Sequence, residues 1–213
     1  MKFVPVAGTK VLFGVWDVRV MDYQVYAQAN PGGDNSWQKP AFTQGNDYPV
    51  VNVNWTQAKA FCEWLTQKER SEGKISKSQS YRLPTEVEWN KAVGDTTYPW
   101  GEKKSPPNRA GNFASSLGVD RYENTSPVGS FKPNQFGLYD MGGNVWQWCE
   151  NEYSPGSGTR VLRGASWRDS LSANLISSYR YNCTPDSRSN TFGFRVVLFD
   201  SSSRQTGHPQ ASP

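Results

Sequence analysis

The spacing of apolar residues predicts two kinds of element near the start of the chain. Apolar and polar residues alternate through residues 3–16 on either side of Ala7-Gly8-Thr9, a pattern typical of two strands joined by a turn. Residues 18–30 change to near-helical spacing, which the sequence Pro31-Gly32-Gly33 ends. The apolar positions of this segment are Val18, Met21, Val25 and Ala29. Residues 31–49 show neither period and are predicted to form a loop.

The clearest helix is predicted within residues 50–73. One apolar stripe recurs there at the three- and four-residue spacing of a helical face, and Asn54 is placed to cap the N-terminus. The stripe consists of Ala58, Phe61, Cys62 and Leu65. Because it belongs to this stripe, Cys62 is expected to be a small core residue and not a reactive thiol.

A second main helix is predicted within residues 81–94, where Thr85 and Glu88 form a T-x-x-E capping box and Gly94 stands at the C-terminal end. After it come turns and short apolar strands, with no visible repeat. Two main helices followed by a long, short-stranded half predict an α+β domain with much irregular structure. A chain of 213 residues is enough for one domain, expected at residues 1–200 with a flexible tail at 201–213.

Composition indicates how such a loop-rich domain fills its core. Hydrophobic residues make up only 36% of the chain, but aromatic residues reach 14% and include nine Trp. Large rings bury much area per residue, so they can hold loops together where regular elements are few. The 19 Gly and 14 Pro agree with many turns.

Charge, histidine and cysteine exclude several function classes. The net charge of +4 is spread along the chain with no block of Lys and Arg, so no nucleic-acid partner is expected. Cys62, Cys149 and Cys183 have the spacing of neither a disulfide framework nor a zinc site. The one histidine, His208, falls in the predicted tail. The domain therefore has no histidine to serve as a general base or metal ligand.

The lengths of the apolar runs also indicate whether the chain enters a membrane and which compartment it occupies. The first residues lack the apolar stretch of a signal peptide, and no segment reaches the length that spans a bilayer. We therefore expect no membrane insertion and, by default, a cytoplasmic protein.

Six motifs follow one another along residues 3–198. They read YPVVNVNWTQAKAFCEWL, YRLPTEVEWNKAV, YPWGE, SPVGSFKPNQFGLYDMGGNVWQWCEN, RVLRGASW and GFRVV. In this order they resemble the formylglycine-generating-enzyme family, also called the sulfatase-modifying-factor family. The resemblance implies a variant of the C-type lectin fold. The family includes oxidases that convert a sulfatase Cys to formylglycine, iron enzymes of thiol-histidine biosynthesis, and non-catalytic members such as the variable proteins of diversity-generating retroelements.

Neither of the family's known chemistries finds its residues in this chain. The oxidases hold copper with two Cys that lie a few residues after the position of RGASW, because Cu(I) prefers soft sulfur ligands. The matching residues 168–180 contain no Cys, and Asp169 and Asn174 stand about where the thiols would fall. Cys183 follows alone, and the His ligands of the iron enzymes are missing. We expect no catalytic residues and no required cofactor; the alternative is a sulfatase-modifying-factor-like enzyme with altered chemistry.

The resemblance to variable proteins implies a ligand-binding surface at residues 163–197, between RGASW and GFRVV. Those proteins randomise this region through template adenines, which turns Asn codons into codons for Ser, Tyr, Asp, Thr, Cys and Phe. The stretch is rich in these residue types, and Tyr with Ser and Asn makes an adaptable contact surface. We expect an unidentified protein ligand. The predicted contact residues are Arg168, Asp169, Ser170, Ser172, Asn174, Tyr181, Asn182, Cys183, Ser187, Ser189, Asn190 and Thr191.

Other residues around this surface are expected to form its frame. The predicted core tryptophans are Trp146, Trp148 and Trp167. The arginines expected to pair with carboxylates such as Asp186 are Arg163, Arg180 and Arg195. A third reading of the whole chain is a structural or regulatory domain that is fused to a longer protein or cut from one.

The resemblance also implies structural calcium, which the family's enzymes can carry. The first matching set is the side chains of Asn112 and Asp120 with the backbone oxygens of Phe113 and Tyr122. The second set is Asp140 and Gln147 with the backbone oxygens of Gly143 and Val145. Oxygen ligands suit a hard cation. Since Gln147 stands where the family usually has Glu, the second site should bind more weakly; loop hydrogen bonding without metal is the alternative at both.

Overall fold

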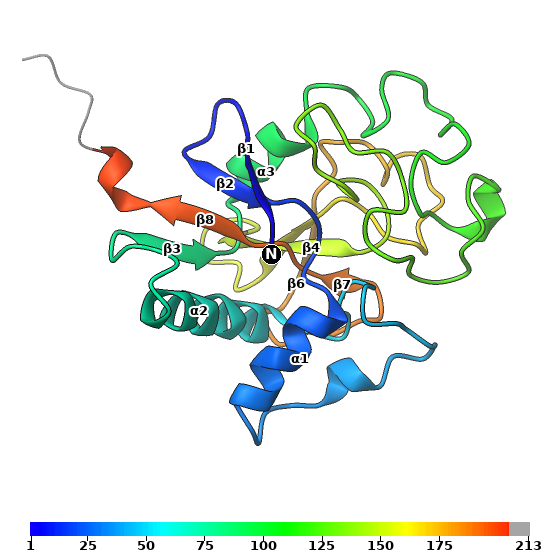
Figure 1. Cartoon of the computed structure of the whole chain (residues 1–213). Coiled ribbons are helices and arrows are strands. Elements are labelled where there is room, and N and C mark those ends of the chain that lie inside the picture. Colours follow the sequence, from blue (N-terminus) through cyan, green and yellow to red (C-terminus); the bar gives the residue numbers. More distant parts are fainter. Residues whose placement is uncertain (205–213) are drawn as a thin grey trace, which may run out of the picture.

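Two four-stranded sheets and three α-helices form the fold in the computed structural model, which describes residues 1–204 (Figure 1). The first sheet consists, in spatial order, of β1 (Phe3–Pro5), β2 (Val11–Gly14), β8 (Val197–Asp200) and β3 (Gln79–Arg82). The second sheet consists of β6 (Tyr181–Cys183), β5 (Arg160–Arg163), β4 (Trp146–Glu152) and β7 (Phe192–Gly193). The helices are α1 (Val20–Ala29), α2 (Trp55–Ser71) and α3 (Glu86–Val93). Short 3₁₀ turns lie at Ser36–Gln38, Ser115–Leu117 and Ser201–Arg204.

The first sheet joins the two ends of the domain. β1 and β2 pair antiparallel as the predicted hairpin, and β8 lies between β2 and β3. Phe13 and Val197 are register partners, and both are buried. Because β8 begins at Val197, the last residue of GFRVV, the polar segment before it is anchored at its C-terminal end by this sheet.

α2 and α3 form where caps and apolar positions agree, as predicted. Asn54 Oδ1 accepts the Gln57 N–H at 2.8 Å, and the Gln57 side chain returns to the Asn54 N–H at 3.0 Å. The four stripe residues of α2 are all buried. Thr85 and Glu88 form the second reciprocal cap, and Gly94 ends α3 with a φ of 101°.

The near-helical spacing of residues 18–30 is confirmed by α1, a third helix beside the two predicted main helices, but the buried face of α1 differs from the predicted stripe. Val25, expected on its apolar stripe, is 48% exposed, whereas Tyr23 is 2% exposed. The Tyr23 ring stacks on Phe61 of α2 at 5.8 Å and meets Trp37 edge-on at 5.4 Å. Ring packing therefore decides the orientation of α1, because a Tyr buries far more area than a Val.

Residues 94–145 contain almost no regular structure, and polar side chains hold these loops. Asn144 Oδ1 accepts the Ser126 N–H at 3.0 Å and the Asn112 Nδ2–H at 3.2 Å. The Asn134 Nδ2–H donates to the Ala92 carbonyl at 2.7 Å, which joins the loops to α3. Buried backbone groups outside sheets must find partners elsewhere, and amide side chains supply them here.

The described residues end within the predicted tail at 201–213. Residues 201–204 form a 3₁₀ turn whose first residue, Ser201, bonds to the Ser78 carbonyl through its N–H and its hydroxyl, both at 3.0 Å. The rest of the predicted tail, including His208, lies outside the described residues. None of the helices in residues 1–204 combines the length and apolar character needed to cross a bilayer.

Candidate ligand-binding site

The polar segment 163–197 begins at the last residue of β5, contributes β6 and β7 to the second sheet, and ends at the first residue of β8 in the first sheet. It leaves β5, runs through loops to β6, and enters β7, which pairs in parallel with β4. β4 thus lies between the strands at the two ends of the segment. This pairing brings residues near 168 and residues near 190 to one place although they are far apart in sequence.

A pocket of about 260 Å³ lies at this place, and we call it the polar pocket. It is lined by Trp146, Ser166, Arg168, Asp169, Asn174, Tyr179, Tyr181, Ser189, Thr191 and Phe192. Six of the predicted contact residues line it. They are Arg168, Asp169, Asn174, Tyr181, Ser189 and Thr191. The structure therefore brings together half of the predicted surface around one depression.

Aromatic rings form one wall of the polar pocket. The Trp146 ring lies 5.3 Å from the Tyr181 ring and 5.9 Å from the Tyr179 ring. Tyr181 also contacts Phe192 at 6.1 Å between ring centres, yet it remains 38% exposed. Burial and the neighbouring Cys183 raise the pKa of the Tyr181 hydroxyl.

Some polar groups in the wall of the polar pocket are already hydrogen-bonded to the rest of the domain. Asp169 Oδ2 accepts the Ser166 N–H at 3.0 Å and the Ser166 Oγ–H at 2.6 Å. The Asp169 carbonyl accepts the Ala114 N–H at 3.1 Å, which ties this turn to the loops. Arg168, by contrast, is exposed and has no carboxylate within 4.0 Å among residues 1–204. Arg168 is therefore the cation that this pocket offers to a ligand.

Thr191 was predicted as an exposed contact residue, and this is wrong: only 8% of it is exposed. Its carbonyl accepts the Trp146 N–H at 2.7 Å, and its hydroxyl lies 2.8 Å from Ser189 Oγ. Thr191 directly precedes β7, so the parallel pairing of β7 with β4 draws it inward. It still lines the floor of the polar pocket.

Trp167 lies between frame and surface, not in the core as predicted. It is half-buried, its Nε1–H donates to the Asn190 carbonyl at 3.1 Å, and its ring meets Phe42 edge-on at 5.6 Å. Trp146 and Trp148 are buried as predicted. Trp167 thus fixes the position of Asn190, whose Oδ1 is buried without a hydrogen-bond partner.

The remaining predicted contact residues lie outside the polar pocket. They are Ser170, Ser172, Asn182, Cys183, Ser187 and Asn190. Ser170 is exposed, and the others are intermediate in exposure. Ser187 closes a turn with Thr184, whose carbonyl accepts the Ser187 N–H at 3.0 Å. Arg188 next to it reaches Asp34 at 3.4 Å and ties this turn to the loop after α1.

Glu86, the first residue of α3, binds the segment at two points. Its Oε1 accepts from Arg163 Nη1 and from Arg180 Nε, both at 2.6 Å, and its Oε2 accepts from Arg180 Nη2 at 2.9 Å. The prediction that Asp186 would serve as a carboxylate partner is wrong, because Asp186 is exposed and accepts from the Thr184 hydroxyl. One carboxylate thus holds the residues on either side of the loop 164–179.

Arg195 has a separate partner behind the site. It lies 3.6 Å from the Asp17 carboxylate, and both residues are fully buried. It also donates to the Gly14 carbonyl at 2.7 Å and to the Tyr139 carbonyl at 2.6 Å. Arg195 therefore joins the first sheet to the loops, as expected of a bidentate cation in a buried position.

Sequence reasoning missed four lining residues. Tyr179, Ser166 and Phe192 are not among the predicted contact residues, and Trp146 was predicted only as a core residue. Tyr179 is one of two tyrosines that flank Arg180, and that Tyr-Arg-Tyr pattern is the signal that was available. Ser166 is set by its bond to Asp169, which residue types alone do not reveal.

The three cysteine thiols differ in burial. Cys62 and Cys149 are fully buried, and burial raises the pKa of each thiol above its ordinary value. Cys183, on β6, is the thiol of the polar segment and lies beside Tyr181. Among residues 1–204 there is no cluster of three or more His, Cys, Asp or Glu placed to hold a metal ion.

The first predicted calcium set includes an unused oxygen. Asn112 Oδ1 is buried without a partner, while its Nδ2–H donates to the Asn124 carbonyl at 2.8 Å. Both oxygens of the Asp120 carboxylate accept backbone N–H groups, from Phe113 at 3.1 Å and from Tyr122 at 2.8 Å. The buried Asn112 oxygen without a donor is the feature of this set that favours a cation.

The second predicted calcium set does not fit. Gln147 Oε1 accepts from Trp89 Nε1 at 2.9 Å and lies 3.3 Å from Arg195 Nε. The Gln147 amide N–H₂ donates to the Asp140 carbonyl at 2.8 Å. The oxygen that a cation would need is therefore committed to two donors, and an N–H group faces Asp140.

The fold and the polar pocket define an α+β domain of C-type-lectin-like architecture with a C-terminal surface suited to ligand contact. This chain belongs to the sulfatase-modifying factor enzyme 1-like domain family, whose profile matches residues 3–199. The resemblance seen in the six motifs is thereby confirmed.

This chain is similar both to relatives named as formylglycine-generating enzymes and to relatives named as inactive. It is 39% identical over 181 residues to the inactive C-alpha-formylglycine-generating enzyme 2 of Bos taurus, covering 76% of this chain and 55% of that protein. It is 33% identical over 194 residues to the formylglycine-generating enzyme of Streptomyces coelicolor, covering 76% and 57%. The chain thus spans about half the length of these curated relatives, and membership of the family does not decide catalysis.

Solved structures support the architecture. PvdO from Pseudomonas aeruginosa is 25% identical with a TM-score of 0.69, covering 89% of this chain and 80% of that one. The Treponema denticola variable protein 1 is 24% identical with a TM-score of 0.68, covering 92% and 91%. At 24% identity, the similarity to the Treponema denticola protein shows a shared fold alone.

Proposed function

We propose that this protein is a non-catalytic ligand-binding protein whose polar segment, residues 163–197, presents a diversified surface to a protein partner. One observation carries the proposal: six of the predicted contact residues, distant in sequence, converge on the polar pocket while buried frame residues hold the segment from behind. A surface whose side chains vary while its backbone keeps the same path needs contact residues that are separate from the residues holding the backbone.

The chemistry of the polar pocket favours binding over oxidation. Asp169 and Asn174, which stand about where the family's oxidases carry their thiols, line the polar pocket with oxygen and amide groups. Cys183 is one thiol, and two are needed for a copper site of the oxidase kind. An inactive relative at 39% identity shows that the family's domain exists without the activity.

The residue types support diversification. The lining combines Tyr, Asn, Ser and Thr with one free Arg, the mixture that contact surfaces of adaptable binders use. The residues between them are bound to the frame, as Arg180 is to Glu86 and Trp167 is to the Asn190 backbone. The likeness in fold to a variable protein agrees with a retroelement origin.

The test is selection of a partner followed by substitution on two faces. A binder enriched from a displayed protein library should lose at least about tenfold in affinity when Tyr181→Ala or Arg168→Ala is introduced. The matched control is Val87→Ala, because Val87 is 70% exposed but lies on α3, outside the polar pocket. Binders that respond to Val87→Ala and ignore Tyr181→Ala would contradict the proposal.

The second candidate, an enzyme of the sulfatase-modifying-factor kind with altered chemistry, rests on family membership and on the position of the polar pocket. It is tested by incubating the protein with copper and a Cys-containing sulfatase peptide and following the peptide mass. Conversion of the Cys that Asn174→Ala abolishes would replace the binding proposal with an enzymatic one. An unchanged peptide mass is the expected result.

We further propose that the first oxygen set binds structural calcium, with Asn112, Phe113, Asp120 and Tyr122 as its residues. Calcium would fix the loop 112–122 by satisfying the buried Asn112 oxygen. Adding a chelator should lower Tm, and calcium in excess should restore it. Asn112→Ala should abolish this response, whereas Gln147→Ala should retain it. A Tm that calcium leaves unchanged in the wild type would refute the proposal.

A further inference from the structure

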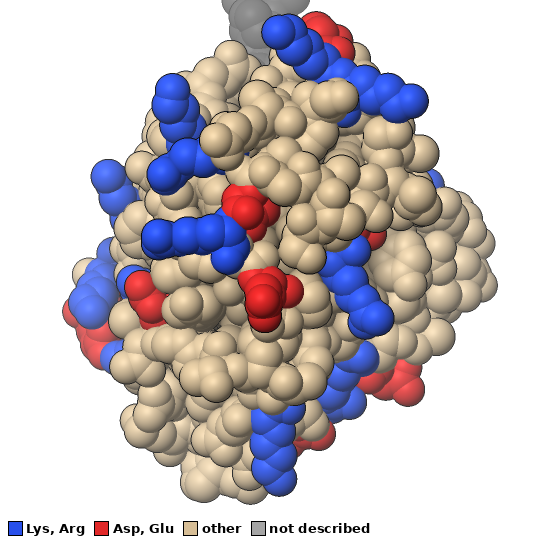
Figure 2. All heavy atoms as spheres, turned by 90° about the vertical axis from the view of Figure 1, so that its right-hand side faces the viewer, with Lys and Arg blue, Asp and Glu red and all other residues tan. Residues whose placement is uncertain are grey.

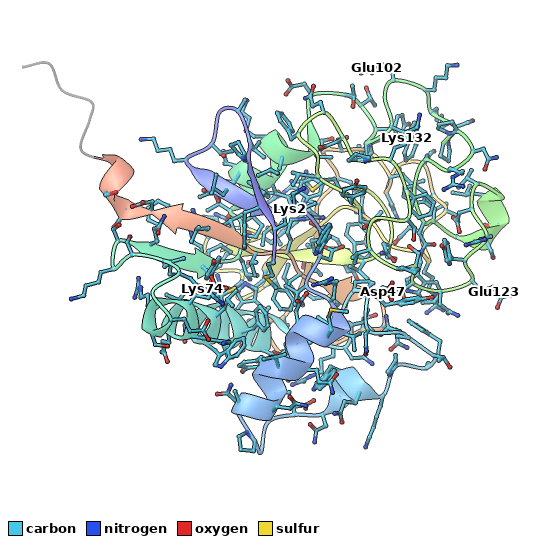
Figure 3. The ribbon with its side chains drawn as sticks, viewed as in Figure 1. Lys2, Asp47, Lys74, Glu102, Glu123 and Lys132 are labelled. Atoms are coloured by element: carbon cyan, nitrogen blue, oxygen red, sulfur yellow. The ribbon has the colours of Figure 1, made fainter. Side chains whose placement is uncertain are left out.

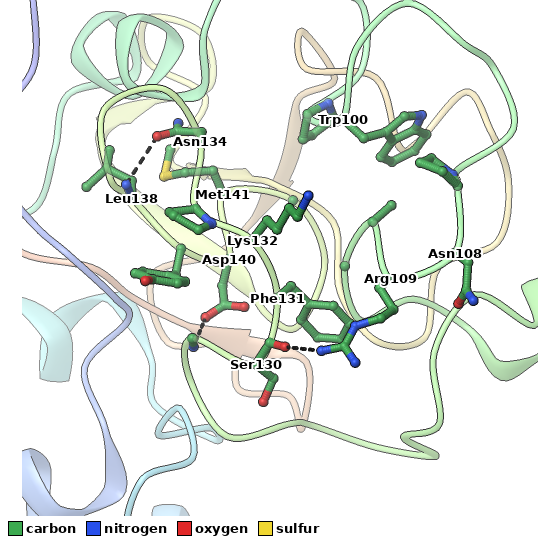
Figure 4. Close-up of a pocket in the computed structure, with 18 residues that line it drawn as sticks. Trp100, Asn108, Arg109, Ser130, Phe131, Lys132, Asn134, Leu138, Asp140 and Met141 are labelled. Carbon is green, nitrogen blue, oxygen red and sulfur yellow. Dashed lines mark hydrogen bonds between the residues drawn. The ribbon is translucent and has the colours of Figure 1, made fainter.

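A second and larger cavity lies in the loops, away from the polar segment (Figure 4). It has a volume of about 860 Å³ and lies between residues 99–111 and residues 129–142; we call it the loop cavity. It shares no lining residue with the polar pocket. Its size is within the range of sites that bind small organic molecules.

Two cations line the loop cavity without a carboxylate partner. Among residues 1–204, neither Arg109 nor Lys132 has a carboxylate oxygen within 4.0 Å. The Arg109 guanidinium donates to the Ser130 carbonyl at 3.3 Å, which leaves most of its N–H groups free. Lys132 extends across the cavity toward Trp100 (Figure 4).

The position of Arg109 is built into the backbone. Its φ is 63°, a left-handed conformation that non-glycine residues rarely adopt, and its N–H donates to the Val119 carbonyl at 2.7 Å. Strained residues of this kind persist where surrounding structure holds them and often mark a site. The guanidinium is thus held at the wall by an ordered turn.

Apolar groups form another part of the lining. Trp100 stacks on Tyr98 with 4.9 Å between ring centres, and its Nε1–H donates to the Lys103 carbonyl at 2.7 Å. Phe131 and Pro99 add apolar surface. Gly142 allows the walls to meet, because a Cβ there would lie 2.5 Å from Pro99. The cavity therefore combines cations with flat apolar surface.

The lining of the loop cavity also contains one carboxylate, Asp140, which is engaged within the wall. Asp140 Oδ2 accepts the Gly129 N–H at 2.8 Å, and its charge is offset by Arg195 behind the wall. Glu102 accepts hydrogen bonds from Thr97, forms no ion pair with Lys132, and lies at the outer edge of the loops (Figure 3). An adjoining pocket of about 330 Å³ shares Arg109 and adds Asp120, Arg121 and Tyr122, and both oxygens of Asp120 already accept backbone N–H groups. Positive charge therefore prevails at the cavity.

We propose that the loop cavity binds a small organic anion, in which a carboxylate or phosphate meets Arg109 and Lys132 and a planar apolar part lies against Trp100 and Phe131. Arg recognises such anions through paired N–H donors, and Lys adds a point charge. This site is independent of the proposed protein-binding surface.

The test is calorimetric titration with four probes. Phenyl phosphate and benzoate carry a ring and an anion, inorganic phosphate carries the anion alone, and benzyl alcohol carries the ring alone. Saturable binding is expected for at least one of the first two, and comparing them identifies phosphate or carboxylate as the preferred head. Weaker binding is expected for both single-feature probes.

Substitutions of lining residues test whether the probes bind in the loop cavity. Arg109→Gln and Lys132→Gln should each weaken the preferred probe about tenfold. Trp100→Ala should weaken it while leaving inorganic phosphate unchanged. Lys104→Gln, an exposed charge change in the same loops, is the matched control and should have little effect. Circular dichroism and Tm verify that each variant is folded, and Tyr181→Ala should leave anion binding intact.

Three outcomes would overturn the proposal. They are the absence of saturable binding by both ring-bearing anions, an equal loss in Lys104→Gln, and retention of affinity in the folded Arg109→Gln and Lys132→Gln variants. The second outcome would mean diffuse attraction by net charge. None of these outcomes bears on the polar pocket, so the two proposals fail separately.

Discussion

The regular part of the molecule and its loop part are held together by different forces. In α2, α3 and the first sheet, backbone hydrogen bonds satisfy the polar groups, and apolar side chains such as Phe61 and Trp89 supply the stability. In residues 94–145 and in the loops that join or follow the strands of the second sheet, side chains such as Asn144 and Arg195 make the hydrogen bonds that a ladder would make. Figure 1 shows the contrast, with helices and paired strands on one side and green loops on the other.

This difference explains where a binding surface can be placed. A loop held by a few buried polar anchors keeps its path when the residues between the anchors change. In the segment 163–197 the anchors are Arg163, Arg180 and Arg195. Apart from buried residues such as Leu175 and Phe194, most residues between them line the polar pocket or are at least partly exposed. A helix or a strand would couple each side chain to its neighbours, so it would tolerate fewer changes.

The surface charge follows the same division. On the face seen in Figure 2, Lys and Arg are scattered among uncharged residues with Asp and Glu between them, and they form no continuous stripe. Charge on this face is therefore local, as recognition of a specific partner or a small anion requires.

The largest effect is expected from removing Arg195, the anchor that joins the two parts. Arg195→Met should lower the free energy of unfolding by about 3–5 kcal/mol, because it removes the cation beside the buried Asp17 and Asp140 and the donors to the Gly14 and Tyr139 carbonyls. Urea denaturation measures this. Arg188→Met, which breaks an exposed pair with Asp34, should cost about 0.5 kcal/mol and is the control.

A smaller effect should follow from Glu86→Gln, which weakens the contact at both ends of the loop 164–179. We expect a loss of about 2 kcal/mol, since two arginines lose charge-assisted bonds while the amide oxygen keeps one acceptor. Hydrogen exchange should speed up within residues 164–180 more than in α2. Glu123→Gln, an exposed carboxylate on the loops, should change neither quantity; a uniform increase of exchange would show that Glu86 has no specific role in holding the loop.

The sequence predicts the regular part of the fold far better than the loop part. Caps and stripes are local signals, so α2, α3 and the hairpin were found from residue types alone. The orientation of α1 was missed because it depends on Tyr23 meeting Phe61 from another helix. Local spacing contains no information on such a contact.

The site shows the same limit. The polar segment was located by its flanking motifs, but the burial of Thr191 follows from a parallel pairing of β7 with β4, which sequence spacing does not show. The partner of Arg163 lies 77 residues away at Glu86, and the nearer Asp186 was expected instead. Residue types therefore predicted which side chains are polar anchors, while their partners required the fold.

Stability should also depend on pH through the buried anchor pair. Complete burial raises the pKa of Asp17 to about 8, although Arg195 opposes the shift. The folded protein thus retains a proton that the unfolded chain releases above its ordinary pKa of 3.8, so stability should fall as pH rises from about 4 to about 8, by up to about 1 kcal/mol per unit. Asp17→Asn should flatten this slope, and Asp186→Asn, at an exposed position, should not. Parallel slopes for the wild type and Asp17→Asn would contradict the assignment.

The smallest effect on stability is expected at the polar pocket itself. Tyr181 is 38% exposed and its ring contacts Trp146 at the edge of the fold, so Tyr181→Ser should cost less than about 1 kcal/mol. The same change removes the largest exposed ring of the polar pocket and should abolish binding to a partner selected on this surface. Phe192→Ser, one step deeper and 6% exposed, should instead cost about 3 kcal/mol because it opens a cavity against Trp148. If the two substitutions destabilised the protein equally, Tyr181 would belong to the frame, and the division between anchors and contact residues would not hold.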